Sequence, residues 1–140
     1  MQLDAAYRQT CYRACLPGAV ADIRIGSINA DLDRWLSVLG AMTWAFVSAY
    51  NPRSTALPAQ ENVLRHAQLL FRAKQLGWPT ADAQAIAQAE DWPPERGLLI
   101  AGIAHRDALR LAGEFDQYAI VAGRRGSPAK LLWLDAAAQH

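Results

Sequence analysis

The sequence from residue 43 to residue 54 reads Thr43-Trp44-Ala45-Phe46-Val47-Ser48-Ala49-Tyr50-Asn51-Pro52-Arg53-Ser54. Its first half is a short apolar run, which is typical of a buried β-strand. Its second half is polar and contains a proline, which favours a loop over a continued strand. Because binding and catalytic groups are often carried on loops that a rigid scaffold holds in place, we expect this strand to end in a candidate site.

The segments after this loop predict an alternation of helices and strands. A long helix is expected from Pro58 to Leu76, and Gly77 is its stop signal. Residues 81–88 alternate between small apolar and polar side chains, so we expect a strand there although alanine favours helix. Further strands are expected at 98–103, 117–121 and 129–134, with a short helix at 105–114. The inner face of the long helix is expected to hold Val63, Leu64, Ala67, Leu70 and Phe71.

Three more elements are expected before residue 43. The first is a helix from residue 3 to residue 16, because apolar residues recur there at helical spacing and Pro17-Gly18 ends the pattern. A half-buried strand at 20–25 and a short helix at 32–39 follow. The apolar stripe of the first helix consists of Leu3, Tyr7, Cys11 and Cys15.

These elements predict an α+β fold in a single domain that spans residues 1–140. From residue 43 onward the order is strand, helix, strand, strand, helix, strand, which is the split βαβ order of ferredoxin-like folds. We therefore expect a two-layer sandwich with the helices on one face of a mostly antiparallel sheet. The N-terminal elements and the last strand are additions to that core.

The composition argues against several kinds of partner. The formal net charge of the 140 residues is +1, so we expect neither nucleic acid nor a membrane surface to bind. The longest apolar runs are far shorter than the roughly 18 residues that a membrane span needs. The segment Met1-Gln2-Leu3-Asp4 lacks the features of a signal peptide, and two cysteines are too few for a disulfide framework. We therefore expect a cytoplasmic protein.

The polar loop has both a functional and a structural interpretation. In the functional one, Ser48, Asn51, Ser54 and Arg53 surround a small polar or anionic ligand. The N-terminus of the following helix would add positive potential, and Asn62, about one turn into that helix, would point the same way. In the structural one, the asparagine and serine side chains only shape a turn.

Two further residues are expected at the same end of the sheet. Glu95 enters the strand at 98–103, where a carboxylate can act as a general base. Gln117 begins the next strand. The alternative is that Glu95 is a solvated turn residue and that Gln117 is solvated at the edge of the sheet.

No metal or cofactor is expected. His66, His105 and His140 do not form a metal-binding motif, and Cys11 and Cys15 have no nearby histidine to complete a zinc site. We expect both cysteines to be buried on one helix face. The only loop with two close glycines, residues 123–126, lacks the residues of a phosphate-binding loop.

Several motifs spread over nearly the whole chain carry a family resemblance. They are Tyr7-x-x-Thr10-x-Tyr12, the run from Ser48 to Ser54, Glu61-Asn62, Trp92-x-x-Glu95 and Phe115-x-Gln117. In these motifs the chain resembles a bacterial family, domain of unknown function 3293. The family pattern has Phe-Gly-Gln where this chain has Asp116 in place of the glycine. The resemblance implies no activity, but its residue set agrees with the site expected from chemistry.

The sequence therefore leaves two alternative functions for this protein. The first is a small domain that binds a polar or anionic ligand at the Asn51-Pro52-x-Ser54 loop, with Glu95 as general base if the protein is an enzyme. The second is a non-catalytic interaction or dimerisation module, which would form a homodimer through an exposed sheet edge or an aromatic patch at Trp78 and Trp92.

Overall fold

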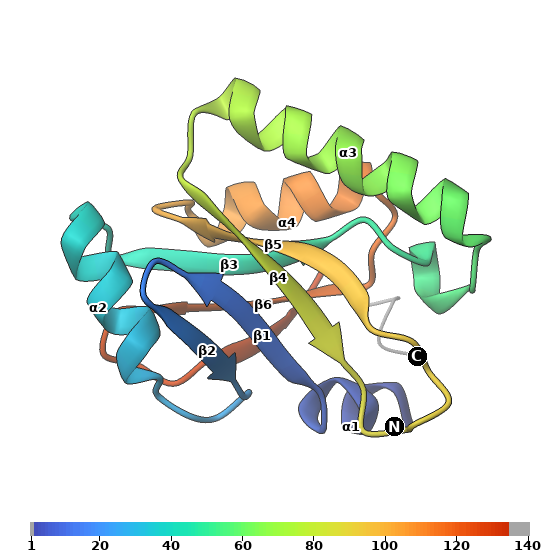
Figure 1. Ribbon diagram of the computed structural model, residues 1–140, viewed down its shortest axis with the longest axis horizontal. Coiled ribbons are helices and arrows are strands. Elements are labelled where there is room, and N and C mark those ends of the chain that lie inside the picture. Colours follow the sequence, from blue (N-terminus) through green and yellow to red (C-terminus); the bar gives the residue numbers. More distant parts are fainter. Residues whose placement is uncertain (1, 135–140) are drawn as a thin grey trace.

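The computed structural model describes residues 2–134, which form four α-helices, a short 3₁₀ turn and a seven-stranded sheet (Figure 1). The fold is therefore α+β. The elements in chain order are α1 (Gln2–Arg8), β1 (Cys11–Leu16), β2 (Ala19–Ile23), α2 (Ala30–Leu39), β3 (Thr43–Ser48), the 3₁₀ turn (Pro52–Ser54), α3 (Ala59–Leu76), β4 (Thr80–Ile86), β5 (Glu95–Ala101), α4 (His105–Glu114), β6 (Ala119–Arg124) and β7 (Lys130–Trp133).

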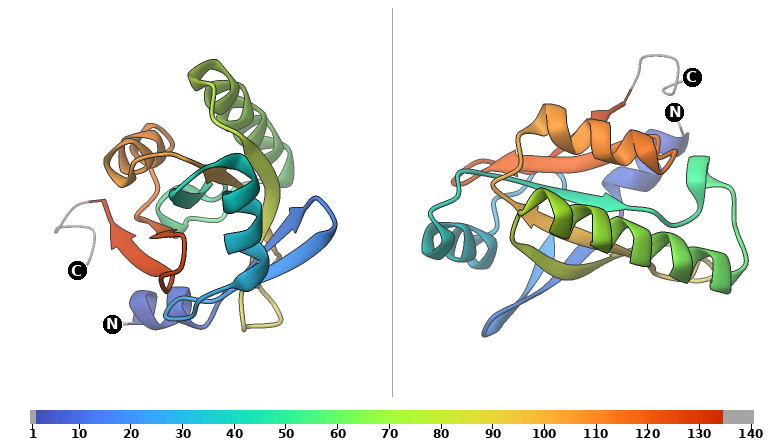
Figure 2. Two further views of the ribbon diagram at one scale, coloured as in Figure 1. Left: turned by 90° about the vertical axis from the view of Figure 1, so that its left-hand side faces the viewer. Right: turned by 90° about the horizontal axis from the view of Figure 1, so that it is seen from above.

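The sheet is antiparallel throughout and strongly curled (Figures 1 and 2). Its strand order is β2-β1-β4-β5-β3-β6-β7. The two edge strands are β2 and β7. The segment that follows β2 and the segment that precedes β7 meet in a bridge between Ile25 and Ala129. The amide of Gly26 donates to the carbonyl of Ala129 at 2.8 Å, and the amide of Ala129 donates to the carbonyl of Ser27 at 3.1 Å. The curl therefore brings the two edges together at one end of the sheet.

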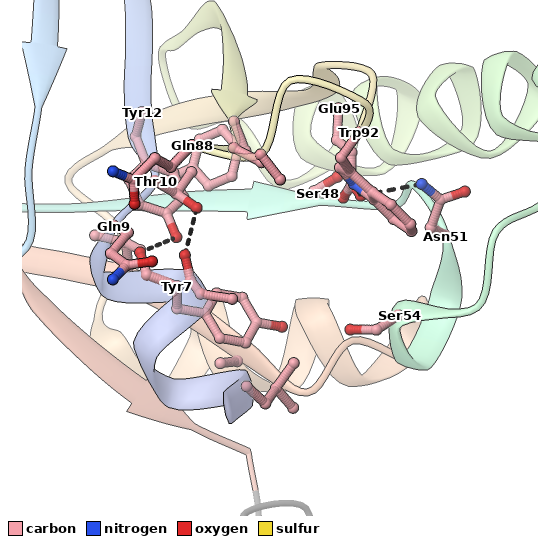
Figure 3. Close-up of a pocket in the computed structure, with 18 of the residues that line it drawn as sticks. Tyr7, Gln9, Thr10, Tyr12, Ser48, Asn51, Ser54, Gln88, Trp92 and Glu95 are labelled. Atoms are coloured by element: carbon pink, nitrogen blue, oxygen red, sulfur yellow. Dashed lines mark hydrogen bonds between the residues drawn. The ribbon is translucent and has the colours of Figure 1, made fainter. Parts of the chain in front are cut away.

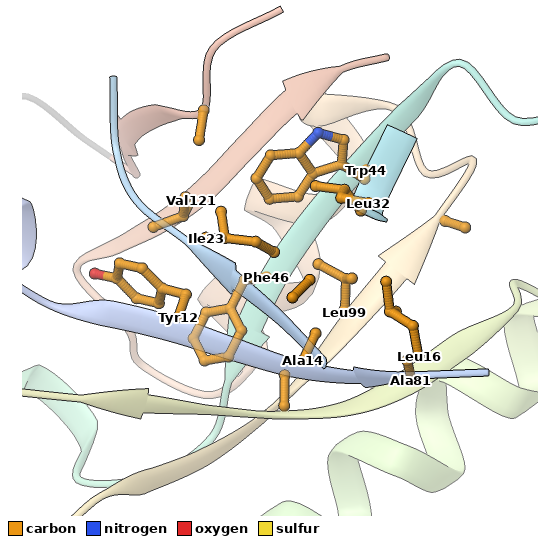
Figure 4. Close-up of a cluster of buried hydrophobic side chains, with 14 of the residues drawn as sticks. Tyr12, Ala14, Leu16, Ile23, Leu32, Trp44, Phe46, Ala81, Leu99 and Val121 are labelled. Carbon is orange, nitrogen blue, oxygen red and sulfur yellow. The ribbon is translucent and has the colours of Figure 1, made fainter. Parts of the chain in front are cut away.

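Each face of the sheet has its own hydrophobic core. On the convex face, α3 and α4 pack side by side and bury Leu69 and Leu111 against Ile100 (Figure 2). On the concave face, Leu32 and Leu36 of α2 pack into a cluster with the large side chains of the central strands (Figure 4). The helices thus lie on both faces, which differs from the predicted arrangement on one face. The curl creates the concave surface that α2 covers, and curl is not visible in local sequence patterns.

The N-terminal prediction of one helix over residues 3–16 is wrong. A helix ends at Arg8, and β1 follows between β2 and β4. Within β1 the burial alternates, because Tyr12, Ala14 and Leu16 point to the core while Cys15 is exposed. Pairing with strands on both sides outweighs the i,i+4 pattern of apolar residues. The expectation that both cysteines are buried is also wrong for Cys15.

The long helix α3 is present at the predicted place but in a different rotation. Its buried residues are Asn62, His66, Leu69 and Ala73. The apolar residues assigned to its inner face are mostly outside: Leu64 and Phe71 are each 64% exposed. Of the two polar residues that face inward, Asn62 forms hydrogen bonds with Asn51 of the polar loop, and the His66 ring lies against the Tyr50 ring.

The other sequence predictions of secondary structure are confirmed in outline. Residues 80–86 form a strand, so the period-two pattern outweighs the helix preference of alanine. The helix at 105–114 has the predicted bounds. The strands β5, β6 and β7 each lie within a few residues of their predicted positions.

Candidate functional site

A cavity of about 440 Å³ lies on the concave side of the sheet, where β3 ends and β5 begins (Figure 3). Its walls come from the end of β3, the starts of β1, β5 and β6, the segment after β4, and α1. The inner part is apolar, with Tyr12 and Phe46 among the lining side chains. The outer part holds the polar side chains that follow β3 and begin β5.

Asn51 is the centre of the hydrogen bonds at the polar end. Its amide N–H donates to Oδ1 of Asn62 at 2.9 Å, and Nδ2 of Asn62 donates back to Oδ1 of Asn51 at 2.7 Å. The same Oδ1 accepts from the backbone amide of Leu57 at 3.0 Å. Asn62 is only 5% exposed. These bonds tie the loop to the first turn of α3, so Asn62 acts as a support behind the cavity and does not line it.

Glu95 faces Asn51 across the polar end of the cavity (Figure 3). Its Oε2 accepts from Nδ2 of Asn51 at 3.0 Å and from the indole Nε1 of Trp92 at 2.7 Å. Both donors are neutral. The other oxygen, Oε1, accepts no hydrogen bond from the part of the chain that the structure describes. A half-buried carboxylate is thus held in place by one oxygen, and its second oxygen can accept from a ligand.

Ser48 and Gln117 complete the polar end. The hydroxyl of Ser48 donates to the carbonyl of Arg96 at 2.7 Å and accepts from the amide of Tyr50 at 3.1 Å. Gln117 donates through Nε2 to the carbonyl of Tyr50 at 3.1 Å. Ser48 therefore ties the loop to β5, and Gln117 ties it to the segment before β6, while both side chains line the cavity.

The backbone of this loop is unusual. Asn51, Arg53 and Ser54 have φ values of 45°, 52° and 58°, and Asp116 beside them has 55°. Left-handed backbone is costly for residues other than glycine and persists only where its surroundings enforce it. The amide of Arg53 donates to the carbonyl of Asp116 at 2.9 Å, which joins the two left-handed segments.

Tyr7 from α1 closes the opposite side of the cavity. Its hydroxyl points towards the Ser54 hydroxyl (Figure 3). Burial raises the pKa of the Tyr7 phenol to about 12, although the neighbouring Ser54 hydroxyl partly opposes this rise. Burial likewise raises the pKa of Tyr12. Both phenols are therefore neutral near pH 7, and the Tyr12 hydroxyl donates to the backbone carbonyl of Tyr7 at 3.1 Å.

The structure brings most of the predicted site residues together. Five of the seven line the cavity: Ser48, Asn51, Ser54, Glu95 and Gln117. Asn62 lies directly behind Asn51, whereas Arg53 is exposed and outside the cavity lining.

The sequence analysis missed the aromatic part of the lining, which consists of Tyr7, Tyr12, Phe46 and Trp92. Three of these residues belong to motifs of the family resemblance, and that signal could have identified them. The wrong helix over residues 3–16 concealed two of them. In that helix, Tyr7 and Tyr12 would not have faced the sheet together.

The structure also bears on the predictions about an aromatic patch, a metal site and a membrane span. Trp78 is half-buried in the core under α3, and Trp92 lines the cavity beyond the opposite end of β4, so they do not form a shared exposed patch. Within residues 2–134, no three His, Cys, Asp or Glu side chains gather where they could hold a metal ion; His140 lies outside that range. No described helix combines the length and apolar character of a membrane span.

Comparison with known proteins assigns the chain to a family. The model of a family described as a protein of unknown function (DUF3293) matches residues 47–120, which is more than half of the chain. The chain belongs to this family, as its motifs indicated. Searches of curated proteins and of solved structures found no match. The matched region begins in β3 and ends in β6, and it includes Asn51, Asn62, Glu95 and Gln117.

The left-handed backbone of Asp116 explains why a glycine suits this position. Glycine adopts positive φ without the Cβ penalty that other residues incur. We expect Asp116→Gly to raise the free energy of unfolding by about 0.5–1 kcal/mol, because relief of the penalty exceeds the added entropy of the unfolded chain. Urea denaturation measures this. The matched change Asp107→Gly, in the first turn of α4, should instead destabilise; a loss of stability in Asp116→Gly would contradict the backbone argument.

A buried histidine lies under α3, next to the site but outside the cavity. His66 is 3% exposed, and neither ring nitrogen has a hydrogen-bond partner in the described residues. Its ring meets Tyr50 edge-on at a centroid distance of 6.3 Å. Desolvation lowers the pKa of His66; the charge of Arg96 on β5 lowers it further, and Asp82 on β4 opposes this. The folded protein therefore holds this imidazole neutral.

This histidine should make the protein sensitive to acid. Since the pKa is lower in the folded state than the unfolded value of about 6.5, the unfolded chain gains the proton first as pH falls. The free energy of unfolding should decrease below about pH 6.5, by at most about 1.4 kcal/mol per pH unit, until the folded pKa is reached. We expect His66→Leu and His66→Gln both to remove this part of the slope in urea titrations between pH 7.5 and 5.5. Slopes equal to wild type in both variants would show that His66 is not responsible.

Proposed function

We propose that this protein binds a small polar organic molecule in the cavity between α1 and the loop of residues 49–54. The observation that carries the proposal is the composition of the cavity wall, which has an aromatic, apolar interior and a cluster of polar groups at one end. Its volume of about 440 Å³ lies in the range of small-molecule sites, whose lining is usually of this mixed kind.

The polar end is well ordered for recognition. Asn51 and Glu95 are held to each other and to Asn62 and Trp92 by hydrogen bonds. Side chains fixed in this way lose little freedom when a ligand binds, which favours affinity. Glu95 is also the group with the chemistry of a general base, because its Oε1 lies free of protein donors within residues 2–134. We assign no reaction to it.

A thermal-shift screen of the purified protein against metabolites tests the proposal. A ligand present at a hundredfold excess over its Kd stabilises by about 2.7 kcal/mol, which raises the melting temperature measurably. Ala85→Leu should abolish the shift, because Ala85 lines the cavity and the larger side chain fills it. The control is Gln84→Leu, on the same strand with its side chain on the other face. Hits that persist in Ala85→Leu would place binding elsewhere.

A second candidate function is self-association through the outer face of α3. Leu64 and Phe71 are two turns apart and both 64% exposed, so a two-fold axis between them would place each against the other residue of a second copy. Light scattering would test this: a dimer that Leu64→Glu converts to monomer supports it, and a monomeric wild-type protein excludes it.

We also propose that the part of the chain from β3 to β6 is a ferredoxin-like unit with strands added on both sides. Support comes from the strand order β4-β5-β3-β6 within the sheet and from α3 and α4, which pack side by side on one face. In this view the cavity arises because the added strands β1 and β2 curl over the other face.

A further inference from the structure

The charges around the cavity differ from those that an anion would need. Among the described residues that line it, the charged side chains are both acidic, Asp91 and Glu95. Arg53 of the loop and Arg65 of α3 do not line the cavity. Arg53 is exposed, and Arg65 of α3 donates to the backbone carbonyls of Ala49 and Phe115 outside the lining. Within residues 2–134, the side chains that line the cavity therefore carry negative charge and no positive charge.

The hydrogen bonds of Glu95 point to the same conclusion. Its Oε2 is satisfied by two neutral donors, the Asn51 amide and the Trp92 indole, which orient the carboxylate without neutralising it. Its Oε1 accepts nothing from residues 2–134. A half-buried carboxylate in this state gains most from a donor that is itself positively charged, because the Coulomb attraction between opposite charges adds to the hydrogen bond and is stronger near a protein than in bulk water.

The remaining lining suits the uncharged body of a ligand that carries a positively charged donor. Tyr7, Tyr12 and Phe46 supply an aromatic and apolar surface for its body. Trp92, which Glu95 holds by its indole nitrogen, adds an aromatic ring near the carboxylate, and aromatic faces attract organic cations. The cavity thus combines one anionic acceptor with an aromatic interior.

From this combination we propose that the ligand is a protonated amine with an aromatic or aliphatic body, whose ammonium group binds Oε1 of Glu95. The inference rests on the proposed binding function of the cavity and narrows it to one chemical class. It departs from the expectation of an anionic ligand, because the side chains that line the cavity would repel an anion.

Three probes with the same body and different charge test the proposal. They are phenethylamine, 2-phenylethanol and phenylacetate, titrated into the protein at pH 7 by calorimetry. The wild-type protein should bind the amine at least about tenfold more tightly than the alcohol, and phenylacetate most weakly. Glu95→Gln should bring the amine to within about twofold of the alcohol, because the amide keeps an acceptor for Asn51 and Trp92 and removes only the charge. Glu90→Gln, in the same segment but outside the cavity lining, should leave the preference unchanged.

The outcomes separate the two proposals. The amine class is wrong if phenethylamine does not bind at millimolar concentration, if phenylacetate binds as tightly, or if Glu95→Gln retains the preference in a folded protein. If phenylacetate binds and Ala85→Leu abolishes it, the cavity is the site and only the class is wrong. If the amine binds Ala85→Leu as well as wild type, the site itself is wrong. The order of the three probes on the wild-type protein decides the class even if Glu95→Gln does not fold.

Discussion

Asn62→Ala is expected to lower the free energy of unfolding by about 2–4 kcal/mol. The Asn62 side chain is almost fully buried and satisfies both the amide N–H and the Oδ1 of Asn51. Its removal leaves the Asn51 amide N–H without its acceptor and takes one of two donors from Oδ1, which keeps the bond from Leu57; a polar group left unpaired costs about 1–3 kcal/mol, and the cavity left by the side chain adds to this. Asn51 is also the residue with left-handed backbone at the start of the turn, so loss of its partner should release the loop.

Urea denaturation and hydrogen exchange measure the two parts of this effect. The loop amides of Asn51 and Leu57 should lose protection in Asn62→Ala more than the amides of the central strands do. Gln68→Ala removes an exposed amide from the same helix and should change stability by less than about 0.5 kcal/mol. If the two variants are equally stable, the asparagine pair does not hold the loop.

Gly97→Ala is expected to destabilise the protein by about 2–3 kcal/mol or more. A Cβ at this position would lie 2.5 Å from Cζ of Phe46 and 2.8 Å from the carbonyl oxygen of Val47. The first contact requires the ring to move, and the second involves backbone that cannot rotate away. Overpacking of a well-filled core typically costs about 1–3 kcal/mol. Phe46 lines the cavity, so a displaced ring should also impair ligand binding.

A double-mutant cycle separates these two contacts. Phe46→Leu removes the ring atoms that clash, so Gly97→Ala should cost less in that background than in the wild type. The residual cost then reports the contact with Val47. Gly113→Ala is the control, since its Cβ would meet nothing closer than 3.5 Å and helix propensity favours alanine by about 1 kcal/mol. If Gly97→Ala leaves the free energy of unfolding unchanged, the sheet and the Phe46 ring can shift to accept the Cβ, and the close packing at Gly97 does not limit stability.

The sequence predicted most elements after residue 43, because their signals are local. The strand at residues 80–86 follows from alternation, and the helix at 105–114 from its length and spacing. The polar loop and Glu95 were found because proline, asparagine and a carboxylate at strand ends have recognisable chemistry. Their convergence on one cavity also follows from the antiparallel order, which brings the end of β3 beside the start of β5.

The remaining features depend on long-range contacts. The rotation of α3 is set by Asn62, which turns inward to bond Asn51, and a hydrophobic pattern gives polar residues no such preference. The strand β1 is made by its two neighbours in the sheet, β2 and β4, the latter about 70 residues away. The aromatic lining could not be assembled without the curl. In each case the residues in contact are far apart in the sequence, so a local sequence pattern cannot indicate the contact.

The bridge between Ile25 and Ala129 has a consequence for how copies of this protein behave in concentrated solution. Edge strands normally offer unpaired backbone groups to which another chain can add. Here some of the backbone groups beside the two edges form hydrogen bonds with each other, between Gly26 and Ala129 and between Ala129 and Ser27. The net charge of +1 provides little mutual repulsion. Near this bridge, the curl of the sheet therefore leaves each edge with fewer free backbone groups to which a second copy could add.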